Sequence, residues 1–309
     1  MKVLVTGGAG FIGSHLVDAL VGRGDQVLVL DDLSEGERAQ VPAQAEFRRL
    51  DIRGAETAQA VREWRPDAVC HHAAQMSVSR SVREPRFDVD VNVAGSVNLI
   101  DAAREAGSRF IFASTGGALY GDAEVLPTPE SYRPWPISPY GVAKLSVEHY
   151  LHCYRVQHGL SYVALRYANV YGPRQTPHGE AGVVAIFALN LLGGQPAVIY
   201  GDGLQTRDYI HVDDVVAANL AALDSEVSGH FNVGTGREAT VNEVFHHIAG
   251  RLGLDGAETH GPARPGDQRT SALDSTLIEG ELGWRPRVGL EEGLERTVDW
   301  FWARQGAVR

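Results

Sequence analysis

The chain has 309 residues, of which 44% are hydrophobic, and a formal net charge of −11. This length allows one large domain or two ordinary ones with a substantial core. An acidic chain without a basic cluster is a poor candidate for binding nucleic acid or an anionic membrane, and no apolar run is long enough to span a bilayer.

Short apolar segments alternate with helical patterns through the first half of the chain. The segments that we expect to form strands are residues 2–6, 26–31, 67–74, 109–115 and 161–167. The helical patterns between them cover roughly residues 12–23, 55–64, 87–106 and 140–158. This alternation predicts an α/β fold with a Rossmann-type, doubly wound parallel sheet, in which the carboxyl ends of the strands meet at one edge and bind ligands there.

The second half of the chain is less regular, with glycine- and proline-rich stretches between helical patterns. We expect residues 169–202 and 234–309 to form a smaller C-terminal α/β region that binds the substrate. Residues 203–233 are expected to return to the main sheet. The dinucleotide-binding domain would then comprise residues 1–168 and 203–233.

A glycine-rich segment, TGGAGFIGSH, follows the first expected strand directly and contains Gly7, Gly10 and Gly13. Glycine permits the tight turn and lets the backbone approach a pyrophosphate closely. The N–H groups of the helix that starts near Phe11 and Ile12 would point at that anion. Such a pattern is weak alone, but here a strand precedes it and a helix follows, which favours a dinucleotide site.

Acidic residues follow the next two strands. Asp31 ends the second strand about 20 residues after the glycine loop, where a carboxylate binds the adenosine ribose hydroxyls. Asp32 follows it, and two acids would repel a 2′-phosphate, which favours NAD over NADP. Asp51 and Ile52 follow the strand-like stretch AEFRRLD; Asp51 is equally consistent with a contact to the adenine amino group and with a turn cap.

Tyr140 and Lys144 lie in the segment SPYGVAK, and Lys144 is one of only two lysines in the chain. Residues four apart share one face of a helix. A free tyrosine has a pKa of about 10, and a neighbouring ammonium or a positively charged nicotinamide favours its phenolate. The pair therefore predicts a general base beside a hydride acceptor, with Lys144 also placed to bind the nicotinamide ribose.

A hydroxyl is expected beside this pair. The fifth strand ends in FASTGGALYG, which places Ser114 and Thr115 at the ligand-binding edge. A hydroxyl there can bond the reacting oxygen and pass its proton to Tyr140. YxxxK alone is common by chance and usually marks a solvated helical face, so this strand and its position carry the interpretation.

Cysteines and histidines show no pattern typical of disulfides or a metal site. Cys70 and Cys153 are isolated, which favours a reducing cytoplasm. The 12 histidines include the pairs 71–72 and 246–247, but the chain has neither an HExxH motif nor a Cys/His cluster. We therefore expect no metal.

Together, TGGxGFIG, Asp31, Ser114–Thr115, YxxxK and LRYANVYGP resemble the extended short-chain dehydrogenase/reductase family and, within it, the bacterial UDP-glucose 4-epimerases. The likeness covers nearly the whole chain, including GDGLQTRDYIHVDDV and LGWRPRVGLEEGL. It implies a UDP-sugar substrate and tightly held NAD. It also implies a 4-keto intermediate, formed by loss of hydride from C4 and consumed by its return.

The resemblance also implies roles for single residues. Tyr140 and Lys144 would be catalytic, with Thr115 the best match to the catalytic hydroxyl and Ser114 the alternative, because this segment is one residue longer than the family's SSSATVYG type. The matched substrate-binding residues are Asn169 for the phosphates, Tyr200 for the uracil, Arg207 and Arg264 for the diphosphate, Asp267 for the uridine ribose and Ser271 for the sugar.

Further implications concern the reaction, the substrate and the assembly. The family's 4,6-dehydratases and decarboxylases carry an acid directly after the catalytic hydroxyl, whereas Gly116 and Gly117 follow Thr115 here, so only epimerisation is expected. A small residue at Ser271 leaves room for N-acetylhexosamines. Family members commonly form homodimers, here through the helices at 87–106 and 140–158. The alternatives are an epimerase for another nucleotide sugar, such as UDP-glucuronate, and a non-catalytic NAD-sensing regulator.

Overall fold

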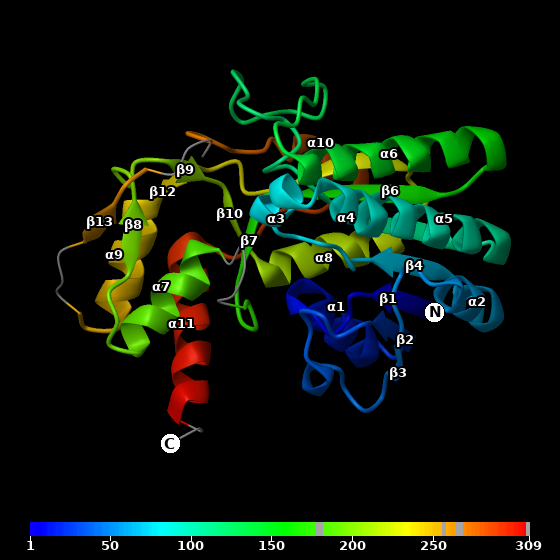
Figure 1. The fold of residues 1–309 in the computed structure, drawn as a ribbon, viewed down its shortest axis with the longest axis horizontal. Helices are drawn as coiled ribbons and strands as arrows, with labels where there is room; N and C mark the ends of the chain where they lie inside the picture. The colour runs from blue at the N-terminus through cyan, green and yellow to red at the C-terminus, as the bar shows by residue number, and fades with distance from the viewer. Residues whose placement is uncertain (177–181, 255–257, 264–267, 307–309) are drawn as a thin grey trace.

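The structure is a computed structural model that describes residues 1–176, 182–254, 258–263 and 268–306 (Figure 1). Its centre is a parallel sheet with the strand order β11-β6-β5-β4-β1-β2-β3. These strands are β1 (Lys2–Thr6), β2 (Gln26–Asp31), β3 (Glu46–Arg49), β4 (Ala68–His71), β5 (Arg109–Thr115), β6 (Tyr162–Tyr167) and β11 (Gly229–Val233). The predicted Rossmann-type α/β fold is confirmed, and the strand order reverses between β1 and β4, where such sheets bind ligands.

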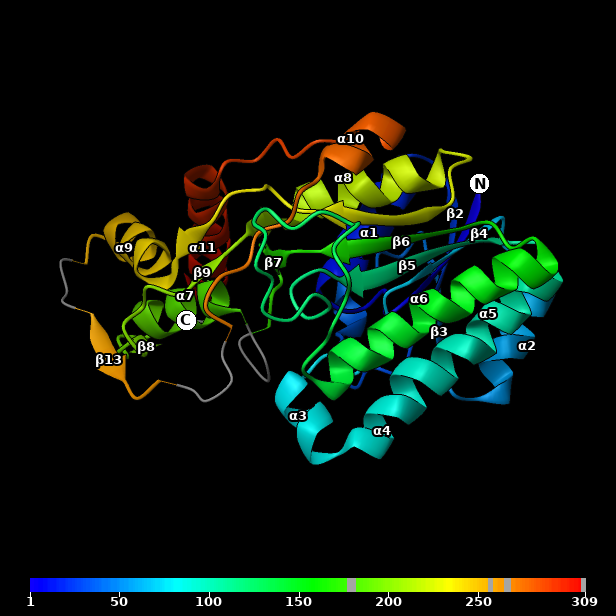
Figure 2. The same cartoon turned by 90° about the horizontal axis from the view of Figure 1, so that it is seen from above.

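Helices cover both faces of this sheet because its strands are apolar on both sides. In β1, Val3 and Val5 pack into the core beneath α1 (Phe11–Gly22), α8 (Val212–Leu223) and α10 (Thr276–Leu282). Leu4 points the other way, into the core beneath α2 (Ala55–Trp64), α5 (Gly95–Ala106) and α6 (Pro139–His158). Figure 2 shows these last three helices side by side over one face.

The helix expected over residues 87–106 is interrupted. The segment begins as α4 (Pro85–Val89), after the short α3 (Val78–Arg83), widens into a π-helix at Asp90–Ala94, and continues as α5. Strand β4 is also shorter than the expected 67–74, because the chain leaves the sheet after His71. Both departures occur beside the ligand-binding edge, where π-helical turns are frequent.

A second group of elements packs beside the carboxyl edge of the sheet. Its strand pairs are β7 (Asn169–Tyr171) with β10 (Tyr209–His211), β9 (Thr206–Arg207) with β12 (Ala239–Thr240), and β8 (Val198–Tyr200) with β13 (Thr259–Gly261). Its helices are α7 (Val183–Leu192), α9 (Val241–Arg251) and α11 (Leu290–Gly306), which share a separate apolar core. The assignment of the cofactor to residues 1–168 and 203–233, and of the substrate to the remainder, stays a prediction.

None of the helices in the described part of the chain combines the length and the apolarity that crossing a membrane requires. A short 3-10 turn at Arg38–Gln40 completes the regular structure.

Candidate active site

A cavity of about 680 Å³ lies along the carboxyl edge of the sheet, and both groups of elements line it. The predicted site residues that line it are Gly7, Gly10, Phe11, Ile12, Gly13, Asp31, Asp32, Asp51, Ile52, Ser114, Thr115, Tyr140, Lys144, Asn169 and Arg207. Tyr200, at the end of β8, and the buried Ser271 are not among its lining residues. Arg264 and Asp267 lie outside the described residues.

The glycine loop makes a backbone surface that larger residues would fill. Gly7 has a φ of +68°, and a Cβ on it would lie 2.6 Å from the backbone nitrogen of Ala73. A Cβ on Gly13 would lie 2.2 Å from the carbonyl oxygen of Gly7. Helix α1 begins directly after Gly10, and no side chain caps it, so its first N–H groups face the cavity edge without a side-chain acceptor. These features fit the pyrophosphate of a dinucleotide.

Asp31 ends β2 with its carboxylate fixed on two sides. Oδ2 accepts the N–H of Ala9 at 2.9 Å, and Oδ1 accepts the N–H of Leu33 at 2.8 Å. Burial raises the pKa of this carboxyl, and the neighbouring charge of Asp32 adds to the rise, while the two N–H donors favour the ionised form. The remaining lone pairs of the Asp31 carboxylate can accept hydrogen bonds from ribose hydroxyls, as the adenosine ribose of NAD requires.

Asp51 has a local partner that the sequence interpretation did not include. The guanidinium of Arg53 donates to it from Nε at 3.0 Å and from Nη2 at 2.5 Å, and Arg53 also pairs with Asp90. The Arg53 hydrogen bonds lower the pKa of Asp51. The contact of Asp51 with adenine stays a prediction, and the ion pair shows that its carboxylate orders the turn after β3.

Helix α6 presents Tyr140 and Lys144, the predicted catalytic pair, because its start is fixed. The Ser138 hydroxyl caps the helix by accepting the N–H of Gly141 at 3.2 Å, and Pro139 occupies the first turn. Lys144 is 4% exposed and donates from Nζ to the carbonyl oxygen of Ala113 at 2.9 Å. Its ammonium lies 5.8 Å from the centre of the Tyr140 ring.

Burial sets the protonation of this pair in opposite directions. It lowers the pKa of Lys144 to about 8, although the carboxylates of Asp88 and Glu148 oppose the change. It raises the pKa of Tyr140, and the charge of Asp88 adds to the rise. Lys144 alone therefore does not bring the Tyr140 pKa below its usual value. A further positive charge, such as that of the oxidised nicotinamide predicted from the sequence, is needed to favour the phenolate.

The two candidate hydroxyls at the end of β5 have different partners. Ser114 is buried, and its Oγ donates to Oε1 of Glu148 at 2.6 Å. Thr115 Oγ1 accepts the N–H of Ala118 at 3.2 Å. Its own O–H donates to no acceptor among the described residues, so this hydroxyl is available to a ligand. This difference favours Thr115 as the catalytic hydroxyl.

Packing disfavours a side chain at the glycine that follows Thr115. A Cβ on Gly116 would lie 2.3 Å from Cδ1 of Leu273, so an acidic side chain at this position would have to displace that leucine. While Leu273 keeps its position, the loop has no space for an acidic side chain here.

Several cavity residues were not identified from the sequence. His72 and Tyr167 both line it, with 3.3 Å between Nε2 and the phenol oxygen, and burial lowers the pKa of His72 to about 4, so its ring is neutral. Gln75 lines it on a segment that Asn92 holds through both backbone groups of Gln75, each at 2.8 Å. The expected strand at 67–74 ends at His71 in the structure, and residues 72–75 line the cavity instead.

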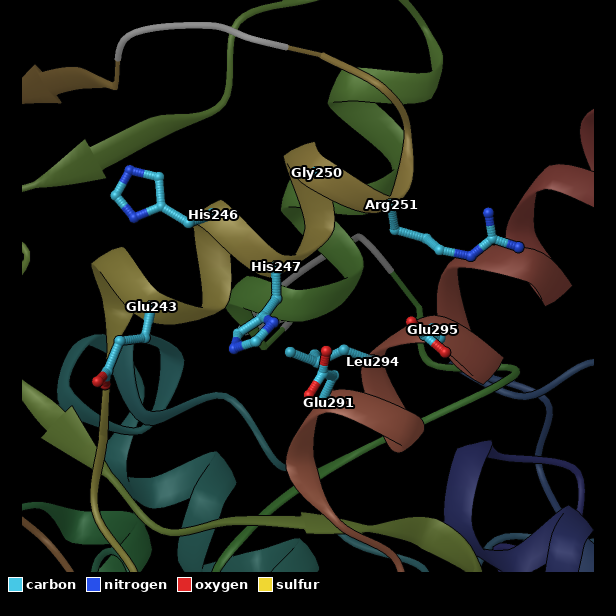
Figure 3. A pocket seen from close by; sticks show the side chains of 8 residues that line it. All are labelled: Glu243, His246, His247, Gly250, Arg251, Glu291, Leu294 and Glu295. Atoms are coloured by element: carbon cyan, nitrogen blue, oxygen red, sulfur yellow. The ribbon is translucent and has the colours of Figure 1, made fainter.

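A second depression of about 540 Å³ lies between α9 and α11 (Figure 3). Three of its charged residues have structural partners: Glu243 completes the capping box of α9, His246 pairs with Glu258 at 2.7 Å, and Arg251 pairs with Asp299 at 2.5 Å. No group of three or more potential metal ligands occurs among the described residues.

A Rossmann sheet that combines a glycine loop, an acid ending β2 and a Thr–Tyr–Lys set at one edge defines a short-chain dehydrogenase/reductase type of site. The chain belongs to the NAD-dependent epimerase/dehydratase family, whose model matches residues 3–234.

Similar proteins extend over the whole chain. A UDP-glucose 4-epimerase of Mycolicibacterium smegmatis is 47% identical over 308 residues, covering 97% of this chain and 98% of that protein. The structure of a UDP-glucose 4-epimerase from Thermotoga maritima with UDP-glucose has a TM-score of 0.96 at 48% identity and covers 100% of both chains. That of a UDP-glucose 4-epimerase from Thermus thermophilus in complex with NAD has a TM-score of 0.92 at 48% identity, covering 97% of this chain and 99% of that one.

The glycine loop gives a direct test of cofactor binding. Gly13→Ala should weaken NAD binding on the order of tenfold, or about 1.4 kcal/mol, because the new Cβ meets the Gly7 carbonyl. Gly22→Ala, at the end of the same helix, places its Cβ in open space and serves as the control. Calorimetric titration with NAD, and the NAD content of the purified proteins, would measure the effect; equal affinity in the two variants would contradict the role of the loop.

Proposed function

We propose that this chain is a UDP-glucose 4-epimerase, which interconverts UDP-glucose and UDP-galactose through a 4-keto intermediate. The observation that carries the proposal is a single cavity whose lining includes Thr115, Tyr140 and Lys144 as well as Asn169 and Arg207. The first set suits proton and hydride chemistry, and the second suits a phosphorylated substrate. The similar proteins described above support this activity over their full length.

The residues that would hold NAD are the glycine loop with the first turn of α1, and Asp31 at the adenosine ribose. When bound, NAD supplies the hydride acceptor and the positive charge beside Tyr140. Lys144 would also donate to the nicotinamide ribose.

Tyr140 acts as the general base in this proposal. Its phenolate accepts the proton of the C4 hydroxyl, directly or through the Thr115 hydroxyl, while the Lys144 ammonium stabilises the negative charge. In the second half of the reaction the Tyr140 hydroxyl returns the proton to the C4 oxygen. Hydride leaves C4 on one face of the sugar and returns to the other, so the reaction involves no net oxidation or reduction.

Binding would be concentrated on the nucleotide. Arg207 is half-buried at the cavity, where a guanidinium can bind the diphosphate, and Asn169 lies on β7 beside it. Arg264, Asp267 and Tyr200 remain candidates for the nucleoside and diphosphate from the family resemblance. An anchored UDP leaves the hexose free to present both faces, which epimerisation requires.

Epimerisation is favoured over the other reactions of the family. A dehydratase needs an additional acid for elimination, and Leu273 fills the space that a side chain at Gly116 would need. An epimerase for UDP-glucuronate or a non-catalytic NAD sensor is the alternative, and the assay below separates them.

N-acetylhexosamine nucleotides are a second candidate substrate class. Ser271 precedes Leu273 by two residues, and Leu273 contacts the glycine that follows Thr115, so this segment borders the catalytic loop. A small side chain at Ser271 would leave space for an N-acetyl group beside the sugar.

We also propose that the chain forms a homodimer in the cytoplasm. The apolar side chains of Val142, Tyr150 and Val156 are exposed along α6, which packs beside α5. A second copy on this face would cover them. Cys70 and Cys153 are free thiols, as a reducing compartment allows.

Light scattering should give twice the chain mass of 33.4 kDa, and a monomeric mass would reject the dimer.

Proton NMR of the purified protein with UDP-galactose and no added cofactor tests the main proposal. The anomeric signal of glucose should grow to equilibrium, and Tyr140→Phe should lower the rate by roughly a hundredfold or more because the base is lost. No conversion of UDP-glucose, UDP-galactose or their N-acetylated forms, even with NAD added, would reject it. Conversion of UDP-glucuronate alone would support the alternative.

The Ser271→Tyr variant tests the wider substrate class. It should lose most activity on UDP-N-acetylgalactosamine and keep activity on UDP-galactose, because the added ring would take the space proposed for the N-acetyl group. The same NMR assay would measure the conversion rate of each sugar, and the ratio of the two rates would be compared between the variant and the parent protein. A variant with full activity on the N-acetylated sugar would show that Ser271 does not control this specificity.

A further inference from the structure

A buried ion pair lies directly behind the catalytic residues. Glu148 occupies the third position of the α6 face that carries Tyr140 and Lys144, at steps of four residues. Its carboxylate accepts hydrogen bonds from Arg166 Nε at 3.0 Å and Nη2 at 2.6 Å, and from Ser114 Oγ at 2.6 Å. Glu148 and Arg166 are 6% and 2% exposed, and neither lines the cavity.

The network continues to the far end of the catalytic loop. Arg166 Nη1 donates to the phenol oxygen of Tyr120 at 2.8 Å, and that phenol donates to Oδ1 of Asn232 at 2.7 Å. Arg166 pairs in register with both Ser114 on β5 and Asn232 on β11. The segment 115–119 is therefore held by one set of buried hydrogen bonds at Ser114, before it, and at Tyr120, after it.

The end of β5 has a second attachment to α6. Lys144 Nζ bonds the carbonyl oxygen of Ala113, and Glu148 bonds the side chain of Ser114. Two successive residues of the strand are thus fixed to two helix residues one turn apart, and Thr115 follows immediately. The arrangement determines where the Thr115 hydroxyl lies relative to Tyr140.

Stability alone does not account for such a pair. Burying two charges costs desolvation free energy, and apolar residues of similar volume are often as stable or more stable. Bonds that fix a catalytic side chain in its working position are a separate benefit, since small displacements lower rates strongly.

We propose that Glu148 and Ser114 are positioning residues of the reaction: Arg166 orients the Glu148 carboxylate, which through Ser114 sets the position of the Thr115 hydroxyl against Tyr140 and Lys144. This inference rests on the proposed function, because it takes Thr115 as the hydroxyl that contacts substrate.

Glu148 also contributes charge beside Lys144. The other titratable groups that face this ammonium are Asp88 on α4, Tyr140 on α6, His71 on β4 and His72 just after β4. Burial lowers the pKa values of the two histidines. Asp88 and Glu148 raise the pKa of Lys144 against the effect of burial. Activity that needs the ammonium is lost as the pH rises through this pKa, so Glu148→Gln should move that alkaline limb to lower pH.

Four variants separate positioning from stability. Ser114→Ala removes the hydrogen bond to Glu148 and leaves the ion pair with Arg166 intact. Ser108→Ala is the matched control, since Ser108 is a buried serine just before β5 whose hydroxyl donates to the carbonyl oxygen of Pro66 at 2.6 Å. Glu148→Gln removes the charge. As a rescue, Ser114→Thr keeps a hydroxyl and should recover part of the lost rate.

In the epimerase assay, Ser114→Ala should lower kcat by on the order of tenfold or more, with KM for UDP-galactose within about twofold of the parent. Ser108→Ala should change Tm as much as Ser114→Ala does and leave kcat unchanged. The alkaline limb should move to lower pH in Glu148→Gln and stay in place in Ser114→Ala.

An unchanged kcat in Ser114→Ala, or an unshifted limb in Glu148→Gln, would overturn the inference. It would also fail if Ser114→Ala lost as much activity as Tyr140→Phe while Thr115→Ala stayed active, since Ser114 would then be the catalytic hydroxyl. If Glu148→Gln does not fold, the serine variants still decide the positioning role. If the parent protein has no epimerase activity, the proposed function fails separately. NMR titration of the lysine side chains, of which the chain has two, then tests whether Glu148→Gln lowers the pKa of Lys144 and Ser108→Ala leaves it in place.

Discussion

The parallel pairing of the central strands is the constraint on which this site depends. Because Thr6 stands in register with Leu30 on β2 and with His71 on β4, the loops that follow these strands leave the sheet together. Thr115 on β5 reaches the same edge beside Tyr167 on β6. A shift of one residue in any pairing would turn the side chains of that strand to the opposite face, so the register fixes the chemistry as well as the core.

The second requirement is that charges function while buried. A buried ammonium is costly unless it is paired, and Lys144 combines a carbonyl acceptor from β5 with two carboxylates at longer range. The same burial brings its pKa close to neutrality, a property typical of functional sites. The same environment therefore holds the helix against the strand and shifts the pKa of Lys144, whereas Tyr140 still needs a further positive charge to become a phenolate.

Local sequence patterns predicted much of the sheet and of the candidate site. Contacts between segments that are distant in the sequence could not be predicted in this way. The glycine loop, Asp31 and the Tyr140–Lys144 pair each depend on a strand or helix that the sequence itself indicates. Glu148 resembles an ordinary solvated helix residue, and its burial depends on Arg166, which lies 18 positions later on another element. The π-helical turn at 90–94 has no signal in hydrophobic periodicity. The small strand pairs of the C-terminal half are too short to show an alternation.

The chain passes between the two groups of elements several times, and this limits how they can move. It leaves the main sheet after β6, returns through α8 and β11, leaves again toward β12 and α9, and comes back at α10 before ending in α11 (Figure 1). Proteins that open around a ligand by a hinge usually need only a few residues to bend. With so many segments of chain crossing the boundary, we expect the two groups of elements to move as one rigid body, so that a ligand in the cavity between them would enter and leave through local loop motion.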